Sequence, residues 1–247
     1  MPFSKLLQGQ TSNISLRALI PSPCIICGVC CQNEISLCDF CCTELPWIDK
    51  SCYTCGLPLP DSGLAANYCS KCLLNPPPFT FCRGIFHYQL PVNKLITQFK
   101  FHARTDIGFT LAELLAREFA KEYTDIPCPQ FIVPVPLHRE RLRSRGFNQA
   151  LEICQSIRKT SGIPIAKNLV VKLKRTPPQT QLESAYHRKR NQRNAFFIAK
   201  GNNLKSVNHV AIIDDVVTTT ATIRSLADTL LRHGVRRIDA WCIARAS

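Results

Sequence analysis

The chain has 247 residues, of which 45% are hydrophobic and 19% charged, a balance typical of a globular protein with an apolar core. Its formal net charge of +14 favours a polyanionic partner, nucleic acid or phosphorylated metabolites, although a basic surplus also serves solubility alone. No apolar run approaches the roughly 20 residues needed to span a bilayer, and the polar N-terminal stretch lacks the apolar core of a secretory signal. We therefore expect a cytoplasmic protein without membrane insertion.

Cysteines concentrate in the N-terminal part, where 11 of the 15 lie between Cys24 and Cys72. Disulfides are disfavoured in the cytosol, so such a cluster indicates metal binding. Four Cys-x-x-Cys pairs stand out, and this spacing lets both thiolates reach one tetrahedral Zn²⁺ ion. The predicted ligands are Cys24, Cys27, Cys38, Cys41, Cys52, Cys55, Cys69 and Cys72.

Eight thiolates suffice for two Cys₄ zinc sites. Sequential pairing groups the first four cysteines and the last four, but a crossed arrangement stays open, and Cys30, Cys31 and Cys42 are further thiols that could exchange with them. An iron–sulfur cluster and a redox role are the alternatives to zinc. The segment has little apolar content, so metal binding is expected to supply its folding energy. With every ligand position filled, the zinc is expected to be structural or to support partner contact rather than catalysis.

The composition changes sharply at Asn75 and the three prolines that follow it. Proline interrupts both helices and strands, so we place a domain boundary there, with a Cys-rich zinc-binding module at 1–78 and an α/β domain at 79–247. Strands are predicted at 81–88, 131–135, 170–173, 195–198, 210–213 and 238–243, and helices at 92–99, 108–123, 147–161 and 222–233. This alternation predicts a mainly parallel sheet flanked by helices, with ligands bound beyond the carboxyl ends of its strands.

Residues 210–223 read Val-Ala-Ile-Ile-Asp-Asp-Val-Val-Thr-Thr-Thr-Ala-Thr-Ile, a strand that ends in Asp214 and Asp215 and is followed by a hydroxyl-rich loop and a helix. The free backbone N–H groups at a helix start form a ready phosphate site. Carboxylates repel phosphate but accept hydrogen bonds from a diol, so a sugar phosphate suits both halves of the motif. The plain alternative is a strand–loop–helix connection whose threonines merely cap the helix.

This run resembles the signature by which type I phosphoribosyltransferases bind 5-phosphoribosyl-1-pyrophosphate (PRPP). The resemblance implies that the two acids hold the ribose hydroxyls and that the loop holds the 5-phosphate. The residues so assigned are Asp214, Asp215, Thr218, Thr219, Thr220, Ala221 and Thr222. That family usually has glycine where this chain has Thr220. Glycine adopts positive φ freely and threonine does not, so we expect either a remodelled loop or a reduced phosphate affinity.

Two basic segments are expected to face the site. Residues 134–149 carry Arg139, Arg141, Arg143 and Arg145, which suit a pyrophosphate but also fit a solvated turn. The polar, basic stretch 174–193 suits a mobile flap over an anionic ligand. The candidates for stabilising a departing pyrophosphate are Arg139, Arg143, Lys174 and Arg188.

The Cys-rich module is followed in order by QFKFHARTD, PVPLHRERLRSRGFNQA, RTPPQTQL, RKRNQRNAF and VAIIDDVVTTTATI. This order resembles the ComF family of bacterial competence proteins over nearly the whole chain from Cys24. The resemblance implies PRPP binding with Mg²⁺ and handling of incoming single-stranded DNA during natural transformation, beside a DNA-translocating helicase or other competence proteins. In relatives from non-competent species, it implies DNA utilisation.

Two alternatives stay open. One is an active phosphoribosyltransferase that moves ribose 5-phosphate from PRPP to a nitrogenous acceptor and releases pyrophosphate. In that reaction Mg²⁺ would bridge pyrophosphate and ribose oxygens, and basic side chains would stabilise the departing pyrophosphate. The other is a purely regulatory module that keeps the PRPP site without turnover.

Overall fold

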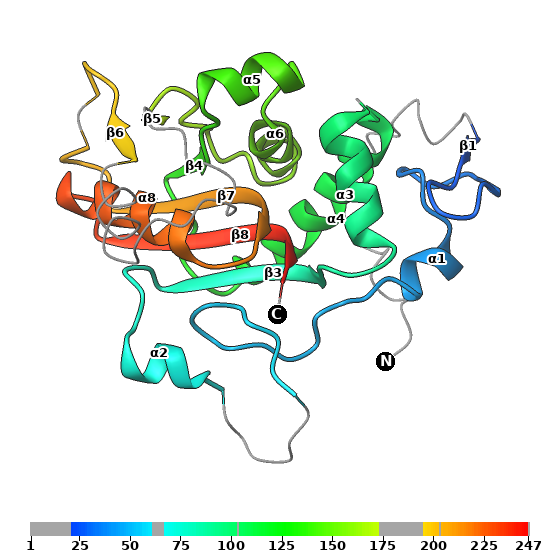
Figure 1. Cartoon of the computed structure of the whole chain (residues 1–247), viewed down its shortest axis with the longest axis horizontal. Coiled ribbons are helices and arrows are strands. Elements are labelled where there is room, and N and C mark those ends of the chain that lie inside the picture. Colours follow the sequence, from blue (N-terminus) through cyan, green and yellow to red (C-terminus); the bar gives the residue numbers. More distant parts are fainter. Residues whose placement is uncertain (1–20, 61–66, 103, 173–194, 203, 247) are drawn as a thin grey trace, which may run out of the picture. The chain divides into compact units, whose positions relative to one another are not determined.

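The computed structural model describes residues 21–60, 67–102, 104–172, 195–202 and 204–246 (Figure 1). Its contacts divide the chain into two compact units, one up to Glu44 and one from Leu45 onward. No helix in the described part of the chain combines the length and the apolar character that crossing a membrane requires.

The described part of the first unit, residues 21–44, consists mostly of turns and irregular backbone. β1 (Ser22–Pro23) and β2 (Cys30–Cys31) form a short antiparallel pair, and the helix α1 (Asp39–Thr43) follows. The sulfur of Cys38 caps this helix by accepting a hydrogen bond from the Cys41 N–H at 3.5 Å. Elements this short cannot bury much apolar surface, which agrees with the expectation that a metal contributes to the stability of this unit.

The second unit is built on a four-stranded parallel sheet in the order β3-β8-β7-β4. Its strands are β3 (Phe81–His87), β8 (Arg237–Arg245), β7 (His209–Val217) and β4 (Phe131–Pro134). The two central strands, β7 and β8, are almost entirely buried, as expected of a parallel sheet that is covered on both faces. The predicted α/β fold class with a mainly parallel sheet is confirmed.

The helices of the second unit pack through apolar stripes. The long ones are α3 (Val92–Phe101), α4 (Thr105–Glu122), α6 (Gln149–Ser161) and α8 (Ala221–Arg232). Leu226 and Leu230 of α8 share a core with Val210 and Ile212 of β7. The intervening residues of β7 point to the opposite face because side chains alternate along a strand. Helices α4 and α6 pack against each other and contact β8 and β7 respectively (Figure 1).

Two features differ from the sequence expectation. The basic segment after β4 forms a helix, α5 (Arg139–Arg145), which ends at Gly146 with φ +79°. None of its residues is buried, so no apolar periodicity announces it. The strands β5 (Val170–Lys172) and β6 (Phe196–Ile198) were expected, but they form a separate antiparallel pair rather than part of the main sheet.

Described residues between Leu45 and the prolines contact the edge strand β3. Thr54 accepts a hydrogen bond from the Cys82 N–H at 2.7 Å, and Trp47 forms an isolated bridge with Phe86. A short helix, α2 (Ser70–Leu74), completes this segment. By contacts, residues 45–78 therefore belong to the same compact unit as the sheet, and the domain boundary at residue 78 stays a prediction.

Candidate functional site

The eight predicted metal ligands come together in two sets of four. We call Cys24, Cys27, Cys38 and Cys41 the first Cys₄ set, and Cys52, Cys55, Cys69 and Cys72 the second Cys₄ set. Within each set the sulfur atoms lie within 4.8 Å of one another. Sequential pairing is thus confirmed, and the extra thiols of Cys30, Cys31 and Cys42 belong to neither set.

The geometry of both sets fits zinc. Tetrahedral Zn²⁺ with Zn–S bonds of about 2.3 Å places its sulfurs roughly 3.8 Å apart. The Cys27 and Cys38 sulfurs are separated by 3.8 Å, and the Cys55 and Cys69 sulfurs by 3.6 Å. Each set therefore has the donor number, donor type and spacing that a structural zinc site requires.

Backbone geometry prepares one thiol of each set for metal binding. Burial raises the pKa of Cys24, but hydrogen bonds from backbone N–H groups outweigh burial and bring that pKa down to about 6. The same balance lowers the pKa of Cys52 to about 7. Because the thiolate is the ligand form of cysteine, these N–H groups favour the state that binds zinc.

The two predicted ribose-binding acids lie near the carboxyl end of β7. The strand continues through Asp214 and Asp215 to Val217, whereas its neighbour β4 ends at Pro134, which pairs with Ile213. Both carboxylates therefore lie beyond the last residue of β4, at the edge where parallel sheets bind ligands. Each carboxylate accepts a backbone N–H bond, Asp214 from Asp215 at 2.9 Å and Asp215 from Val216 at 2.7 Å.

A lysine that was not predicted contacts this pair. Lys100, near the end of α3, places its Nζ 2.6 Å from Oδ2 of Asp215, and both side chains are largely buried. Burial, reinforced by the neighbouring charge of Asp215, raises the pKa of Asp214 to about 8. The two adjacent carboxyl groups therefore differ in their electrostatic surroundings. Asp215 has a cationic partner, whereas Asp214 favours its protonated form near neutral pH.

Further basic groups surround the acids. Burial lowers the pKa of the Arg145 guanidinium, and the charges of Asp215 and Asp214 counter that effect. Burial also lowers the pKa of Lys172 on β5. The charge of Arg141 lowers this pKa further, and the charge of Asp214 opposes the shift. Lys172 Nζ also lies 5.5 Å from the centre of the Phe196 ring.

The four residues proposed for pyrophosphate contact have different positions. Arg139 and Arg143 lie on α5 and are exposed, while Lys174 and Arg188 lie outside the described residues. Sequence reasoning missed Lys100 and Lys172 as members of the site. Lys100 lies in the QFKF motif, between two phenylalanines, and this position was its only local signal.

The predicted phosphate loop joins β7 to α8. Thr218 and Thr219 are exposed, whereas Thr220, Ala221 and Thr222 are partly buried at the start of the helix. The N-cap residue Thr220 makes no side-chain hydrogen bond to the start of α8, so it leaves the N–H groups of the first turn to an anion. Thr220 has φ −74°, a conformation ordinary for threonine, so replacing the usual glycine requires no backbone strain here.

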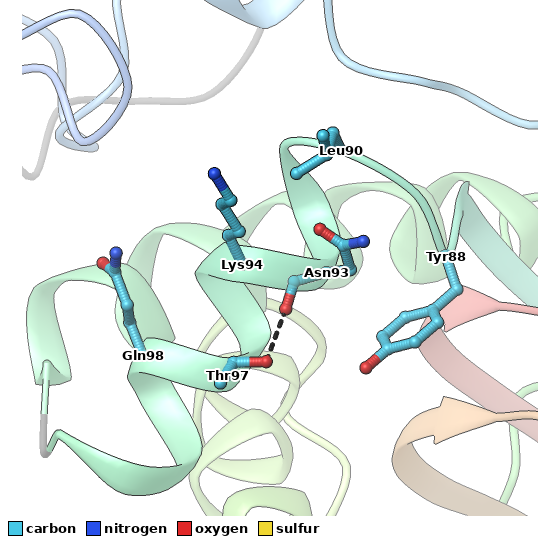
Figure 2. A pocket seen from close by; sticks show the side chains of 6 residues that line it. All are labelled: Tyr88, Leu90, Asn93, Lys94, Thr97 and Gln98. Carbon is cyan, nitrogen blue, oxygen red and sulfur yellow. Dashed lines mark hydrogen bonds between the residues drawn. The ribbon is translucent and has the colours of Figure 1, made fainter.

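A separate groove lies along α3 and the turn before it. It has a volume of about 530 Å³ and is lined by Tyr88, Leu90, Asn93, Lys94, Thr97 and Gln98 (Figure 2). The Thr97 hydroxyl donates a hydrogen bond to the backbone carbonyl of Asn93 at 2.8 Å. None of the predicted site residues lines this groove, so it is not part of the candidate ligand site.

Comparison with known proteins identifies relatives along almost the entire chain, although no family model matches it. DNA utilization protein YhgH of Salmonella typhi is 34% identical over 229 residues, which cover 92% of this chain and 98% of that protein. Competence protein F of Haemophilus influenzae is 36% identical over 226 residues, 89% of this chain and 91% of that protein.

Similar solved structures include the glutamine PRPP amidotransferase of Bacillus subtilis. Its TM-score is 0.40 at 14% identity, over 60% of this chain and 30% of that one. The sequence relatives decide the classification, because they combine identity above one third with coverage of nearly their whole length. The chain belongs to the family of competence protein F and DNA utilization protein YhgH, the ComF family.

Proposed function

We propose that the carboxyl edge of the sheet binds PRPP with Mg²⁺ and that the protein uses this site while it handles single-stranded DNA. One observation carries the PRPP assignment. Asp214, Asp215 and the uncapped start of α8 follow one another along a single strand–loop–helix unit at that edge. A group suited to a diol and a group suited to a phosphate are thereby placed within a few residues of each other, and a ribose 5-phosphate carries both a diol and a phosphate.

The two carboxylates would accept hydrogen bonds from the ribose 2- and 3-hydroxyls. The first-turn N–H groups of α8 and the hydroxyls of Thr218, Thr219 and Thr222 would bind the 5-phosphate. Lys100 already pairs with Asp215, so a bound sugar would share this carboxylate with the lysine or displace the lysine toward the pyrophosphate. The buried position of the ion pair supports a role for Lys100 in the bound state.

The pyrophosphate would lie among the basic side chains around the acids. Lys100, Arg145 and Lys172 are the described candidates, with Arg139 and Arg143 of α5 at greater exposure. Lys174 and Arg188 stay predictions. When bound, Mg²⁺ would neutralise part of the pyrophosphate charge. The carboxylates and phosphate oxygens supply the oxygen ligands that this ion prefers.

The DNA part of the proposal is supported by charge and by the family. A net charge of +14 favours binding to a polyanion, and the names of the two relatives refer to DNA utilization and to competence. Single-stranded DNA in natural transformation is the specific partner that we propose. A DNA-translocating helicase or another competence protein would act beside it.

Calorimetry with PRPP and Mg²⁺ tests the site. Asp215→Asn should weaken binding by about tenfold or more, because an amide loses the charge that accepts the hydroxyl hydrogen bonds and balances Lys100. Asp228→Asn, an exposed acid on α8, is the matched control and should bind like the wild type. Equal affinity in Asp215→Asn and wild type, with the sheet still folded, would refute the assigned site.

Phosphoribosyl transfer is the second candidate function, favoured by the basic groups gathered around the acids. Pyrophosphate release from PRPP with a panel of nitrogenous bases tests it directly. Single-stranded DNA binding with and without PRPP, at a fixed salt concentration, tests the first function. Turnover with one base together with indifference to DNA would replace the DNA-handling proposal with the enzymatic one.

A further inference from the structure

Arg245, the last residue of β8, is a buried guanidinium that connects two distant parts of the second unit. It is 4% exposed. Its Nε donates a hydrogen bond to the Cys55 carbonyl at 3.1 Å. Its Nη1 donates to the Val217 carbonyl at 3.0 Å and also to the carbonyls of Thr218 and Ala246. One side chain therefore binds a residue of the second Cys₄ set and the first residue of the predicted phosphate loop.

The position of Arg245 calls for a negative charge nearby. A buried cation is costly unless it is paired, and carbonyl oxygens offset that cost only in part. Among the described residues, none of the ion pairs includes Arg245. A zinc ion with four thiolates carries a net charge of about −2. The occupied second Cys₄ set would supply the missing charge on the Cys55 side of the guanidinium.

A second arginine makes a parallel connection. Arg224, in the first turn of α8, donates from Nε to the Thr220 hydroxyl and from Nη2 to the Asn75 carbonyl, each at 3.1 Å. Asn75 caps the carboxyl end of α2, the helix that contains Cys72 and starts after Cys69. Arg245 therefore connects Cys55 to Thr218, at the start of the turn at 218–220. Arg224 connects the helix that contains Cys72 to Thr220, at the end of the same turn.

We propose that the second Cys₄ set, through Arg245 and Arg224, holds the phosphate loop in its binding conformation. Zinc in this set and phosphate in the loop would then stabilise each other's binding, since coupling between two sites is reciprocal. The reading of 218–222 as a phosphate loop rests on the proposed function. The mechanical link between zinc and loop does not, because it follows from hydrogen bonds among the protein's own residues.

The consequence of losing the metal follows from these bonds. Without zinc the Cys52–Gly56 turn and α2 are no longer cross-linked, so the carbonyls of Cys55 and Asn75 lose their fixed positions. Arg245 would also lose its opposite charge. Residues 218–222 should then open more often, while the central strands stay protected by their own packing.

Backbone hydrogen exchange of the full chain tests the link without any ligand. In Cys72→Ser, amides at 218–222 should exchange at least ~tenfold faster than in the wild type, with β7 and β8 amides still slow. Cys41→Ser, which removes a ligand of the first Cys₄ set, is the control for general effects of zinc loss and should leave the loop unchanged. Unchanged loop exchange in Cys72→Ser, or equal acceleration in both variants, would overturn the proposal.

Variants of the two arginines test the link with all metal ligands intact, in case Cys72→Ser does not fold. Arg224→Gln and Arg245→Lys should accelerate loop exchange while metal analysis still finds about two zinc ions per chain, as two Cys₄ sites require. Arg232→Gln, an exposed arginine at the other end of α8, is the matched control and should not accelerate it. Loop exchange that stays at the wild-type rate in both arginine variants would rule out the link.

Titration with PRPP and Mg²⁺ separates the two proposals. If the wild type binds PRPP, Arg224→Gln should bind it several-fold more weakly than Arg232→Gln does. If the wild type does not bind PRPP but its loop responds to zinc loss, the proposed ligand is wrong and the link stands. If PRPP binds equally well to the wild type, Arg224→Gln and Arg245→Lys, the link is wrong and the ligand assignment stands.

Discussion

The two Cys₄ sets share a spacing and differ in their surroundings. In the first set Cys27 is exposed and Cys38 partly exposed, whereas all four cysteines of the second set are buried. The second set also packs against Leu57 and Leu59, and its turn hydrogen-bonds to β3. The same ligand motif therefore serves two purposes. In the first unit it would hold together a short stretch of turns, and in the second it forms a small buried cluster of its own beside the edge strand β3.

This contrast teaches that ligand spacing predicts a metal site but not its structural importance. The importance follows from what the surrounding turn touches. Around the second set, Arg83 lies over the rings of Tyr53 and Phe81 at 4.8 Å from each, and Arg245 binds the Cys55 carbonyl. Loss of zinc from the second set should therefore affect the sheet.

The largest expected effect is on the stability of the sheet when one ligand is removed from each set in turn. Cys72→Ser should lower the free energy of unfolding of the second unit by about 3 kcal/mol or more, because a buried metal cross-link is lost. Cys41→Ser should lower it by less than ~0.5 kcal/mol. Urea unfolding followed by the fluorescence of Trp47 and Trp241, both of which lie in the second unit, measures the difference. Equal losses of unfolding free energy in the two variants would show that the two Cys₄ sets contribute equally to the stability of the sheet.

A smaller effect is expected from the glycines that follow the Cys-x-x-Cys turns. Gly56 has φ +65°, and a Cβ there would lie 2.4 Å from the Cys82 carbonyl oxygen. Gly28 in the first set has φ +78° but has nothing within 4 Å of such a Cβ. Gly56→Ala should cost roughly 2 kcal/mol from strain and clash with β3, and Gly28→Ala about 1 kcal/mol from strain alone.

Thermal unfolding and zinc content of the two glycine variants check this prediction together. Each variant reports on the unit that contains it, so the melting of each unit is compared with the wild type. A Gly56→Ala protein as stable as Gly28→Ala would mean that the second turn does not pack tightly on the sheet.

The smallest effect concerns Asp214 at the carboxyl edge of the sheet, whose contribution to stability depends on pH. The pKa of Asp214 in the folded protein is about 8, well above that of an unfolded aspartate. The folded state therefore binds more protons than the unfolded state between about pH 4 and 8, and stability falls as the pH rises through that window. Asp214→Asn removes this cost and should stabilise the protein by roughly 1 to 3 kcal/mol at pH 8.5, and by less at pH 6.

Urea unfolding of Asp214→Asn and wild type at pH 6 and pH 8.5 measures this dependence, with zinc present at both values. Asp228→Asn is again the surface control, and its free energy of unfolding should differ from that of the wild type by the same small amount at both pH values. A stability gain in Asp214→Asn that does not grow with pH would mean that Asp214 is ionised throughout, and the contrast with Asp215 would fail.

The elements that carry a local pattern were predictable. Buried apolar strands such as β7 and β8 stand out from their runs of Val, Ile and Ala, and the two adjacent acids stand at the end of one such run. Cys-x-x-Cys spacing indicated zinc ligands because two thiolates on one tight turn are a local arrangement. Helix α5 was missed because its seven residues are exposed and charged, so it lacks the apolar stripe on which helix prediction depends.

The groups that complete the site depend on the fold. Lys100 meets Asp215, although 115 positions separate them, and Arg245 meets Cys55 across a separation of 190 residues. No local pattern contains such a pair, because the contact exists only after the sheet has formed. The same holds for Arg224 and Asn75.

The amino-acid sequence alone thus determined the α/β class, the position of the two acids near the strand end and the eight cysteines of the two Cys₄ sets, since each depends on spacing within a short segment. The tertiary structure decided how the ligands are grouped, which lysine neutralises which acid, and that the second Cys₄ set packs on the sheet. Those outcomes depend on contacts between segments distant in the chain, and only the register of β3, β8, β7 and β4 brings the segments together.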